Sequence, residues 1–377
     1  MDKINQLLVL YNGRHVGTMA MYKNGRAAFE YSREWINDGF SISPFSLPLE
    51  HRVFVPGIEP FEGLYGVFAD SLPDGWGHLL VDRLLLKKNM SPFEIDSMQR
   101  LAIVGASGMG ALTYEPDYKF ELSNQTLNLD EIATECVNIL HTNYSDNLDL
   151  LFNLGGSSGG ARPKILVSID NSEWIIKFPS SQDRKNIGEQ EYRYSLCARE
   201  CGIPMQETKL FPSDICSGYF GTRRFDRKIY SNGDVKRVHM LSVSGILETS
   251  HRIPNLDYNI LMKLTLELTK DFSEVEKMYR LMCFNVFAHN RDDHSKNFTF
   301  LYDDEVDRWT LSPAYDLTYS MSIGGEHATC VNGNGRNPGL IDLLEVARNI
   351  GIKGGKAKAI AEEIRDIVKV HKLVDAK

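Results

Sequence analysis

The sequence lacks a long apolar run and a paired cysteine motif. Its first apolar stretch, within residues 1–14, follows an Asp and a Lys and is far shorter than the roughly 20 residues of a membrane-spanning helix. Six cysteines are scattered without a CxxC pair, which argues against a disulfide framework or a zinc site. We therefore expect free thiols, a cytoplasmic location and no association with a membrane.

A surplus of basic residues is also missing. The formal net charge is −8, whereas proteins that bind nucleic acid on their own need clustered Lys and Arg to contact phosphates. Any binding to DNA would therefore need a partner. The chain has 377 residues, of which 42% are hydrophobic, so it can form two packed units or one unit with two lobes.

The first part of the chain carries strand signals followed by helical patterns. Two Asn-Gly pairs, at residues 12–13 and 24–25, predict a β-meander over residues 6–31. Helical patterns follow in residues 68–104, where Ser91 is the expected N-cap of the second helix and Pro92 its first residue. These signals predict a first α+β region over residues 1–117.

The rest of the chain continues from strands to helices. Residues 118–255 contain a predicted helix, a glycine-rich loop, two strands and a second helix; these lie at 131–140, 155–164, 165–170, 172–179 and 186–201. Residues 256–377 carry apolar residues at helical spacing. Strands first and helices after predict an α+β fold with two lobes.

The clearest chemical signal is the segment FAHNRDDHSKNFTFL, where Asp292 and Asn297 lie five residues apart between a predicted helix and a predicted strand. This is the spacing of a protein kinase catalytic loop, in which the Asp takes the proton of the substrate hydroxyl and the Asn holds a metal ion. Taken alone, the segment is more often a polar turn between a helix and a strand, because short motifs often match by chance. His294 is an alternative general base, because its ordinary pKa suits neutral pH, but we favour it as a residue that shapes the loop.

Asp316 supports the kinase interpretation. It follows a predicted strand, nineteen residues after Asn297, where a kinase places a second carboxylate for Mg²⁺. One Asn, one Asp, water and nucleotide phosphates form a suitable oxygen shell for this ion. A helix N-cap is the structural alternative for Asp316.

The glycine-rich loop precedes a candidate ATP-binding lysine. Its backbone N–H groups could cradle phosphates, although a flexible linker is the alternative. Lys177 ends the strand pattern WIIK, and Glu191 lies fourteen residues further on, where it could pair with Lys177; Glu189 competes for that role. The order of these motifs is harder to produce by chance than any one of them.

At these residues the sequence resembles the HipA family, the kinase toxins of bacterial toxin–antitoxin modules. The likeness runs over almost the whole chain: LYNGRHVGTM and VFADSLPDGWG resemble the N-terminal subdomain, and SSGGARPK, TRRFDR, NRDDHSKN and AYD resemble the kinase core. The resemblance implies a two-lobed protein-kinase-like fold with an N-terminal α/β subdomain and a mainly helical C-terminal lobe. The three regions then correspond to that subdomain, an N-lobe-like region and the C-lobe with its catalytic loop.

The resemblance also implies specific site residues. Asp292 is the expected base, Asn297 and Asp316 the Mg²⁺ ligands, and Ser157 or Ser158 the autophosphorylated serine. Arg223 to Phe225 resemble the hinge that holds adenine, with Asp226 bracing them, and Pro163 departs from the family loop by removing an N–H donor. The expected ATP-binding residues are Gly159, Gly160, Ala161, Arg162, Pro163, Lys164, Lys177, Arg223, Arg224, Phe225, Asp226, His294, Ser295, Lys296, Asn297, Tyr315 and Asp316.

The sequence therefore predicts a Ser/Thr protein kinase that uses ATP and Mg²⁺ and inhibits growth by phosphorylating a cellular protein. By the resemblance its partner is a helix-turn-helix antitoxin of the HipB type, which would bring DNA binding, and its substrate is a protein such as an aminoacyl-tRNA synthetase. Two alternatives stay open: a lipid or small-alcohol kinase, and an ATP-binding corepressor without catalysis. No cluster of Lys and Arg suits an anionic membrane, which weakens the lipid alternative.

Overall fold

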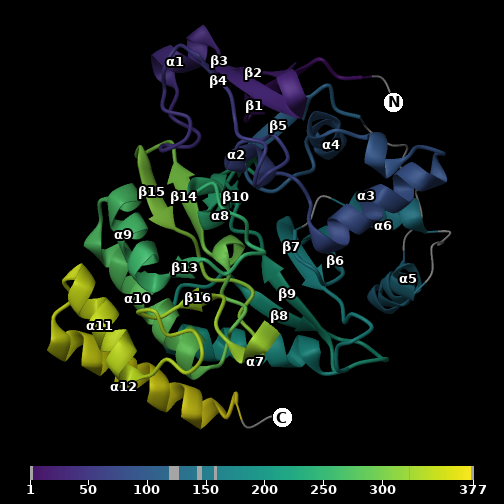
Figure 1. Ribbon diagram of the computed structural model, residues 1–377. Coiled ribbons are helices and arrows are strands. Elements are labelled where there is room, and N and C mark those ends of the chain that lie inside the picture. The colour runs from purple at the N-terminus through teal and green to yellow at the C-terminus, as the bar shows by residue number, and fades with distance from the viewer. Residues whose placement is uncertain (1–2, 119–126, 142–146, 157–158, 322, 375–377) are drawn as a thin grey trace. The chain divides into compact units, whose positions relative to one another are not determined.

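The protein consists of two compact units with mixed α/β structure. The computed structural model describes residues 3–118, 127–141, 147–156, 159–321 and 323–374 (Figure 1). Met1–Gly188 with Leu210–Thr249 form one unit, called unit 1, and Glu189–Lys209 with Ser250–Lys377 form the other, called unit 2. The division of the sequence at residues 117 and 255 follows chain order and stays a prediction.

Unit 1 begins with an antiparallel five-stranded sheet in the order β4-β3-β2-β1-β5. Its strands are β1 (Gln6–Tyr11), β2 (Arg14–Tyr22), β3 (Arg26–Tyr31), β4 (Val53–Phe54) and β5 (Leu112–Glu115). The β1–β2 turn has φ of 45° at Asn12 and 82° at Gly13, a left-handed pair that Asn-Gly adopts readily. Asn24 and Gly25 behave alike, with φ of 61° and 71°, so the predicted meander is confirmed.

Short helices follow the first sheet. They are α1 (Arg33–Asp38), α2 (Gly66–Ala69), α3 (Gly75–Lys87) and α4 (Ser97–Val104). Ser91 is the N-cap position and Pro92 the first residue of the next element, as expected, but this element is only the 3-10 turn Pro92–Glu94, and the Ser91 side chain makes no cap bond. The prediction that the second helix starts here is wrong. Asp96 is the N-cap of α4 instead: its carboxylate accepts the Gln99 N–H at 2.8 Å while the Gln99 side chain accepts the Asp96 N–H at 3.0 Å. This reciprocal pair satisfies two exposed helix donors.

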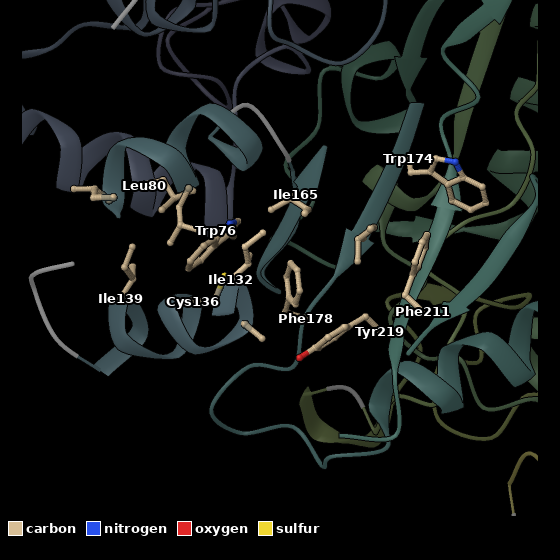
Figure 2. Packing of buried hydrophobic residues seen from close by; sticks show 14 residues of the cluster. Trp76, Leu80, Ile132, Cys136, Ile139, Ile165, Trp174, Phe178, Phe211 and Tyr219 are labelled. Atoms are coloured by element: carbon tan, nitrogen blue, oxygen red, sulfur yellow. The ribbon is translucent and has the colours of Figure 1, made fainter. Parts of the chain in front are cut away.

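A second sheet in unit 1 has the strand order β6-β7-β9-β8. Its strands are β6 (Lys164–Ile169), β7 (Ser172–Lys177), β8 (Thr208–Phe211) and β9 (Tyr219–Arg223). The helices α3, α5 (Leu129–His141) and α6 (Leu148–Gly155) share a hydrophobic core with it (Figure 2). Trp76 of α3 lies in this core with Ile165 of β6. Burial of such large side chains is worth roughly 1.5–3 kcal/mol each, so this core fixes α3 against the strands that carry Lys164 and Lys177.

Unit 1 closes with β10 (Arg227–Ile229), β11 (Val235–Arg237), β12 (His239–Ser242) and α8 (Val243–Ile246). Unit 2 is mainly helical. Its helices are α7 (Ile187–Glu200, which starts in unit 1), α9 (Tyr258–Thr269), α10 (Phe272–Phe287), α11 (Leu340–Ile350) and α12 (Gly354–His371). Its strands are the hairpin β14 (Thr299–Asp303) and β15 (Arg308–Leu311) and the parallel pair β13 (Leu256–Asp257) and β16 (Thr329–Cys330).

The end of α10 is held firmly, which matters because the segment after it carries Asp292. The hydroxyl of Tyr194 on α7 donates to the Ala288 carbonyl at 2.7 Å, and its ring packs edge-on against Phe284. Both aromatic side chains are fully buried. The predicted order of helix, polar loop and strand is confirmed here.

None of the helices in the described parts of the chain is long and apolar enough to cross a membrane. All six cysteines are free in the described structure, and Cys136, Cys197, Cys201 and Cys283 are buried.

The buried histidine of β12 makes unit 1 sensitive to acid. His239 donates from Nε2 to the Ile42 carbonyl at 2.8 Å and is 1% exposed. Burial lowers the pKa of His239 from 6.5 to about 4, and the hydrogen bond to Ile42 only partly opposes this. Between these pH values the unfolded chain binds a proton that the folded chain does not.

We therefore expect unit 1 to have its full stability above pH 6.5 and to lose up to about 1.4 kcal/mol per pH unit as the pH falls toward 4. His239→Gln should reduce this slope, because an amide can donate to Ile42 without titrating. The measurement is the free energy of unfolding in urea between pH 7 and 4.5. The exposed His15, replaced in the same way, is the control, and equal slopes in wild type and His239→Gln would contradict the assignment.

Candidate active site

The structure brings Asp292 and Asn297 together at one turn of unit 2. Asn297 ends the 3-10 turn Ser295–Asn297, directly before β14, and its Nδ2 donates to the Asp292 carbonyl at 2.6 Å. The Asp292 side chain is 62% exposed, so its carboxylate is accessible to a substrate. The segment is therefore a loop closed by a hydrogen bond, with an accessible carboxylate.

Three neighbouring residues shape this loop. His294 accepts the Lys296 N–H on Nδ1 at 3.2 Å, and its Nε2 lies 3.9 Å from Asp292 Oδ1. The Tyr315 hydroxyl donates to the Lys296 carbonyl at 2.5 Å, and the Ser295 side chain is buried. His294 thus has the loop-shaping contact that we expected, and Tyr315 fixes the loop from the segment after β15.

Asp316 follows β15 in a left-handed conformation, with φ of 53°. Residues 317–321 are not helical, so the alternative that Asp316 caps a helix is wrong. A non-glycine residue in this conformation is uncommon and points to a constraint imposed by the surrounding structure.

The glycine-rich loop of unit 1 is held by the segment SLPDGWG. The Gly160 N–H donates to the Asp74 carboxylate, and the Trp76 N–H donates to the Gly160 carbonyl at 3.0 Å. Lys164 is buried and donates from Nζ to the Gly159 carbonyl. These contacts make the flexible-linker alternative wrong for residues 159–164. Ser157 and Ser158 lie outside the described residues.

Asp74 and Gly75 are neighbours of this loop that no sequence motif indicated. Gly75 has φ of +41°, and a Cβ there would lie 2.5 Å from the Gly160 carbonyl oxygen and 2.7 Å from the Ala161 Cα. Only glycine allows so close an approach of two backbones. The Asp-Gly pair before a helical pattern signalled a turn, but not its partner 86 residues away.

Two lysines on neighbouring strands of the second sheet lie opposite each other in register. Lys164 of β6 is the register partner of Lys177 of β7, and Lys177 Nζ lies 5.6 Å from the centre of the Phe220 ring on β9. On α7, Glu191 is buried whereas Glu189 is exposed, which favours Glu191 as the residue with a structural role. Its pairing with Lys177 would join unit 2 to unit 1 and stays a prediction.

Asp226 is fully buried and holds the segment of residues 223–227, called the hinge-like segment. Its carboxylate accepts from Arg224 at 2.9 and 2.7 Å, from Arg227 at 2.8 Å and from the Gly110 N–H at 2.7 Å. Burial by itself would raise the pKa of Asp226, but Arg224 and Arg227 outweigh burial and lower the pKa to about 2.

The hinge prediction needs one restriction. The Arg224 N–H donates to the Glu173 carbonyl at 2.8 Å, so this N–H already has a partner within unit 1. Contacts from Arg223, Phe225 or the Arg224 carbonyl to a base stay predictions.

No group of three or more His, Cys, Asp or Glu side chains is placed to hold a metal ion in the part of the chain that the structure describes. The predicted Mg²⁺ ligands are of another kind, because they comprise one amide oxygen, one carboxylate and the ATP phosphates. Since Nδ2 of Asn297 donates to the Asp292 carbonyl, the amide oxygen is its atom left to contact a cation. Asn297 and Asp316 therefore fit Mg²⁺ chemically.

Two family models match this chain. The HipA N-terminal domain matches residues 7–115, and the HipA-like C-terminal domain matches residues 156–371, more than half of the chain. The chain belongs to the HipA family. The resemblance read from the motifs is thereby confirmed for both parts of the sequence.

Two named relatives are similar to this chain over most of its length. The chain is similar to Y4dM and Y4mE of Sinorhizobium fredii (strain NBRC 101917 / NGR234), both named as candidate kinases. Y4dM is 25% identical over 355 residues, 88% of this chain and 81% of Y4dM. Y4mE is 26% identical over 354 residues, 85% of this chain and 78% of Y4mE.

A solved structure shares the fold. A chain from the Shewanella oneidensis MR-1 complex of the toxin–antitoxin system HipA, HipB and its operator DNA matches with a TM-score of 0.72 and 16% identity. The match covers 98% of this chain and 90% of that chain. At this identity the likeness establishes the fold of the HipA family and no more.

The close approach at Gly75 predicts a specific defect. Gly75→Ala should displace the glycine-rich loop and weaken nucleotide binding by about tenfold or more, because a Cβ cannot fit beside Gly160 and Ala161. The measurement is the dissociation constant of a fluorescent ATP analogue. Gly233→Ala is the matched control: Gly233 also has positive φ, +87°, but no described atom lies within 4 Å of its Cβ position. Equal affinities of the two variants would contradict a role of the glycine-rich loop in nucleotide binding.

Proposed function

We propose that this HipA-family chain is an ATP-dependent serine/threonine protein kinase of the toxin type, which inhibits growth by phosphorylating a cellular protein. The observation that carries the proposal is the closed loop in which the Asn297 amide donates to the Asp292 carbonyl beside an exposed Asp292 carboxylate. This arrangement supports a base and a metal ligand on one turn, as phosphoryl transfer requires.

Each expected residue has a role in the proposal. Asp292 orients the acceptor hydroxyl and receives its proton, Asn297 and Asp316 hold Mg²⁺, and Lys177 with the glycine-rich loop positions the phosphates. ATP would supply the phosphoryl group and leave as ADP, and Mg²⁺ would offset the negative charge that develops during the transfer. Backbone groups of Arg223 to Phe225 hold the adenine, Asp226 braces that segment, and the fold is a two-lobed kinase-like one.

The wider proposal follows the family. The kinase phosphorylates its own Ser157 or Ser158, acts in the cytoplasm, and is restrained by a helix-turn-helix antitoxin of the HipB type that carries the DNA binding. The matched Shewanella chain comes from a complex with HipB and operator DNA, which supports such a partner. The cellular substrate is a protein such as an aminoacyl-tRNA synthetase.

The test is phosphoryl transfer with matched variants. Purified protein, first treated with phosphatase, should gain one phosphate within residues 150–165 when incubated with Mg²⁺-ATP, and EDTA should prevent the gain. Asp292→Asn should slow the gain by about 100-fold or more, because the hydroxyl loses its proton acceptor. Intact-mass spectrometry with peptide mapping measures both effects.

Asp304→Asn is the control, since Asp304 is an exposed carboxylate in the β14–β15 turn of the same unit. Equal rates for wild type and Asp292→Asn would refute Asp292 as the base. A wild type that binds ATP but transfers no phosphate to itself or to any protein would favour the ATP-binding corepressor, and phosphate transfer to a lipid or small alcohol alone would favour that class of kinase.

A further inference from the structure

Asp293, the neighbour of the proposed base, points into the interior of unit 2. It is 1% exposed, and its carboxylate accepts hydrogen bonds from three different groups. The Tyr258 hydroxyl donates at 2.9 Å, His327 Nδ1 at 3.0 Å and the Thr329 N–H at 3.2 Å. A buried carboxylate needs such donors to offset the loss of water, so its position is strongly determined.

The same contacts fix the backbone on both sides of Asp292. The Thr329 hydroxyl donates to the Asp293 carbonyl at 2.5 Å, and the Ala328 N–H donates to the Arg291 carbonyl at 3.1 Å. Residues 328 and 329, at the start of β16, therefore hold the residue before Asp292 and the residue after it. The direction in which the Asp292 side chain leaves the backbone is set by these anchors.

The network continues into the helices that precede the loop. Asn285 of α10 donates from Nδ2 to the Tyr258 hydroxyl at 2.9 Å. Asn290 donates from Nδ2 to the Asn285 side-chain oxygen at 3.0 Å. Hydrogen bonds thus run from the loop residue Asn290 through Asn285 and Tyr258 to Asp293, and buried networks of this kind rigidify the backbone that they join.

We propose that Asp293 is a positioning residue for phosphoryl transfer, through which His327 and Thr329 hold Asp292 in its working orientation. The inference rests on the proposed kinase function. It also makes the β16 segment, which follows Asp316 in the chain, part of the machinery that sets the base.

Asp293→Asn is the principal variant, because it keeps the shape but places an amide donor among the Tyr258, His327 and Thr329 donors. We expect kcat to fall about 10- to 100-fold with the KM for ATP nearly unchanged, since a small misplacement of a catalytic group costs rate more than ground-state binding. Combining it with Asp292→Asn should cause no further loss, because the role of Asp293 acts through Asp292.

Glu274→Gln is the matched control. Glu274 is a buried carboxylate of unit 2 that accepts the Leu311 N–H at 2.9 Å and pairs with Lys277, outside the catalytic loop. Glu274→Gln should lower the melting temperature without the fall in kcat expected for Asp293→Asn. If Asp293→Asn does not fold, Thr329→Val removes only the hydroxyl contact to the Asp293 carbonyl and should give a smaller loss of the same kind.

The rate of amide hydrogen exchange over residues 289–297 tests the anchoring of the loop without depending on kinase activity. Faster exchange there in Asp293→Asn, with melting unchanged, supports the anchor even if the wild type transfers no phosphate. An unchanged kcat, parallel losses in Asp293→Asn and Glu274→Gln, or additive losses with Asp292→Asn would each overturn the positioning role, as would unchanged exchange.

Discussion

The buried carboxylate of Asp226 is the constraint on which the arrangement of unit 1 depends. Asp226 lies between β9 and β10, and its carboxylate accepts the N–H of Gly110, just before β5 and 116 positions away in the sequence. Such a buried ion cluster costs much desolvation, and it is tolerated because Arg224, Arg227 and an N–H satisfy the carboxylate together. Removing one partner of such a cluster typically lowers the free energy of unfolding by about 3–5 kcal/mol. The cluster therefore holds residues 223–227 against the Gly110 backbone, close to the first sheet.

The same principle recurs at each loop that carries proposed chemistry. Asp74 holds the glycine-rich loop, Asp226 holds the segment of residues 223–227, and Asp293 holds the loop that contains Asp292. In every case a side-chain carboxylate binds a backbone N–H of a distant segment. Loops have few internal contacts, so fixing them to rigid elements is what makes a loop precise enough for catalysis.

Much of the fold was predictable from local signals, because hairpin turns and amphipathic helices are encoded within a few residues. The Asn-Gly turns, α5, α7 and the loop of Asp292 and Asn297 are of this kind. The start of the second helix was predicted wrongly at Ser91, because Pro92 can begin a single 3-10 turn as well as a helix. The reciprocal Asp96–Gln99 pair determines where α4 begins. The resemblance led us to expect that Asp226 braces residues 223–225. The contacts of Asp74 and Asp293, and that of Asp226 with Gly110, could not be predicted, because the partners come from remote segments and a single sequence does not reveal the pairing.

The close approach of Gly75 to Gly160 has an evolutionary consequence. Both glycines have positive φ, 41° and 85°, and the two backbones touch where any side chain at residue 75 would collide. A side chain at residue 75 cannot fit without moving the Gly160–Ala161 backbone, whereas a Cβ at Gly160 would meet the Lys164 side chain instead. The position of the glycine-rich loop therefore constrains the N-terminal region, and we expect residue 75 to stay glycine in homologues whose loop keeps this approach. The N-terminal region contributes no expected catalytic group, yet its sequence at residue 75 is constrained by the position of the glycine-rich loop.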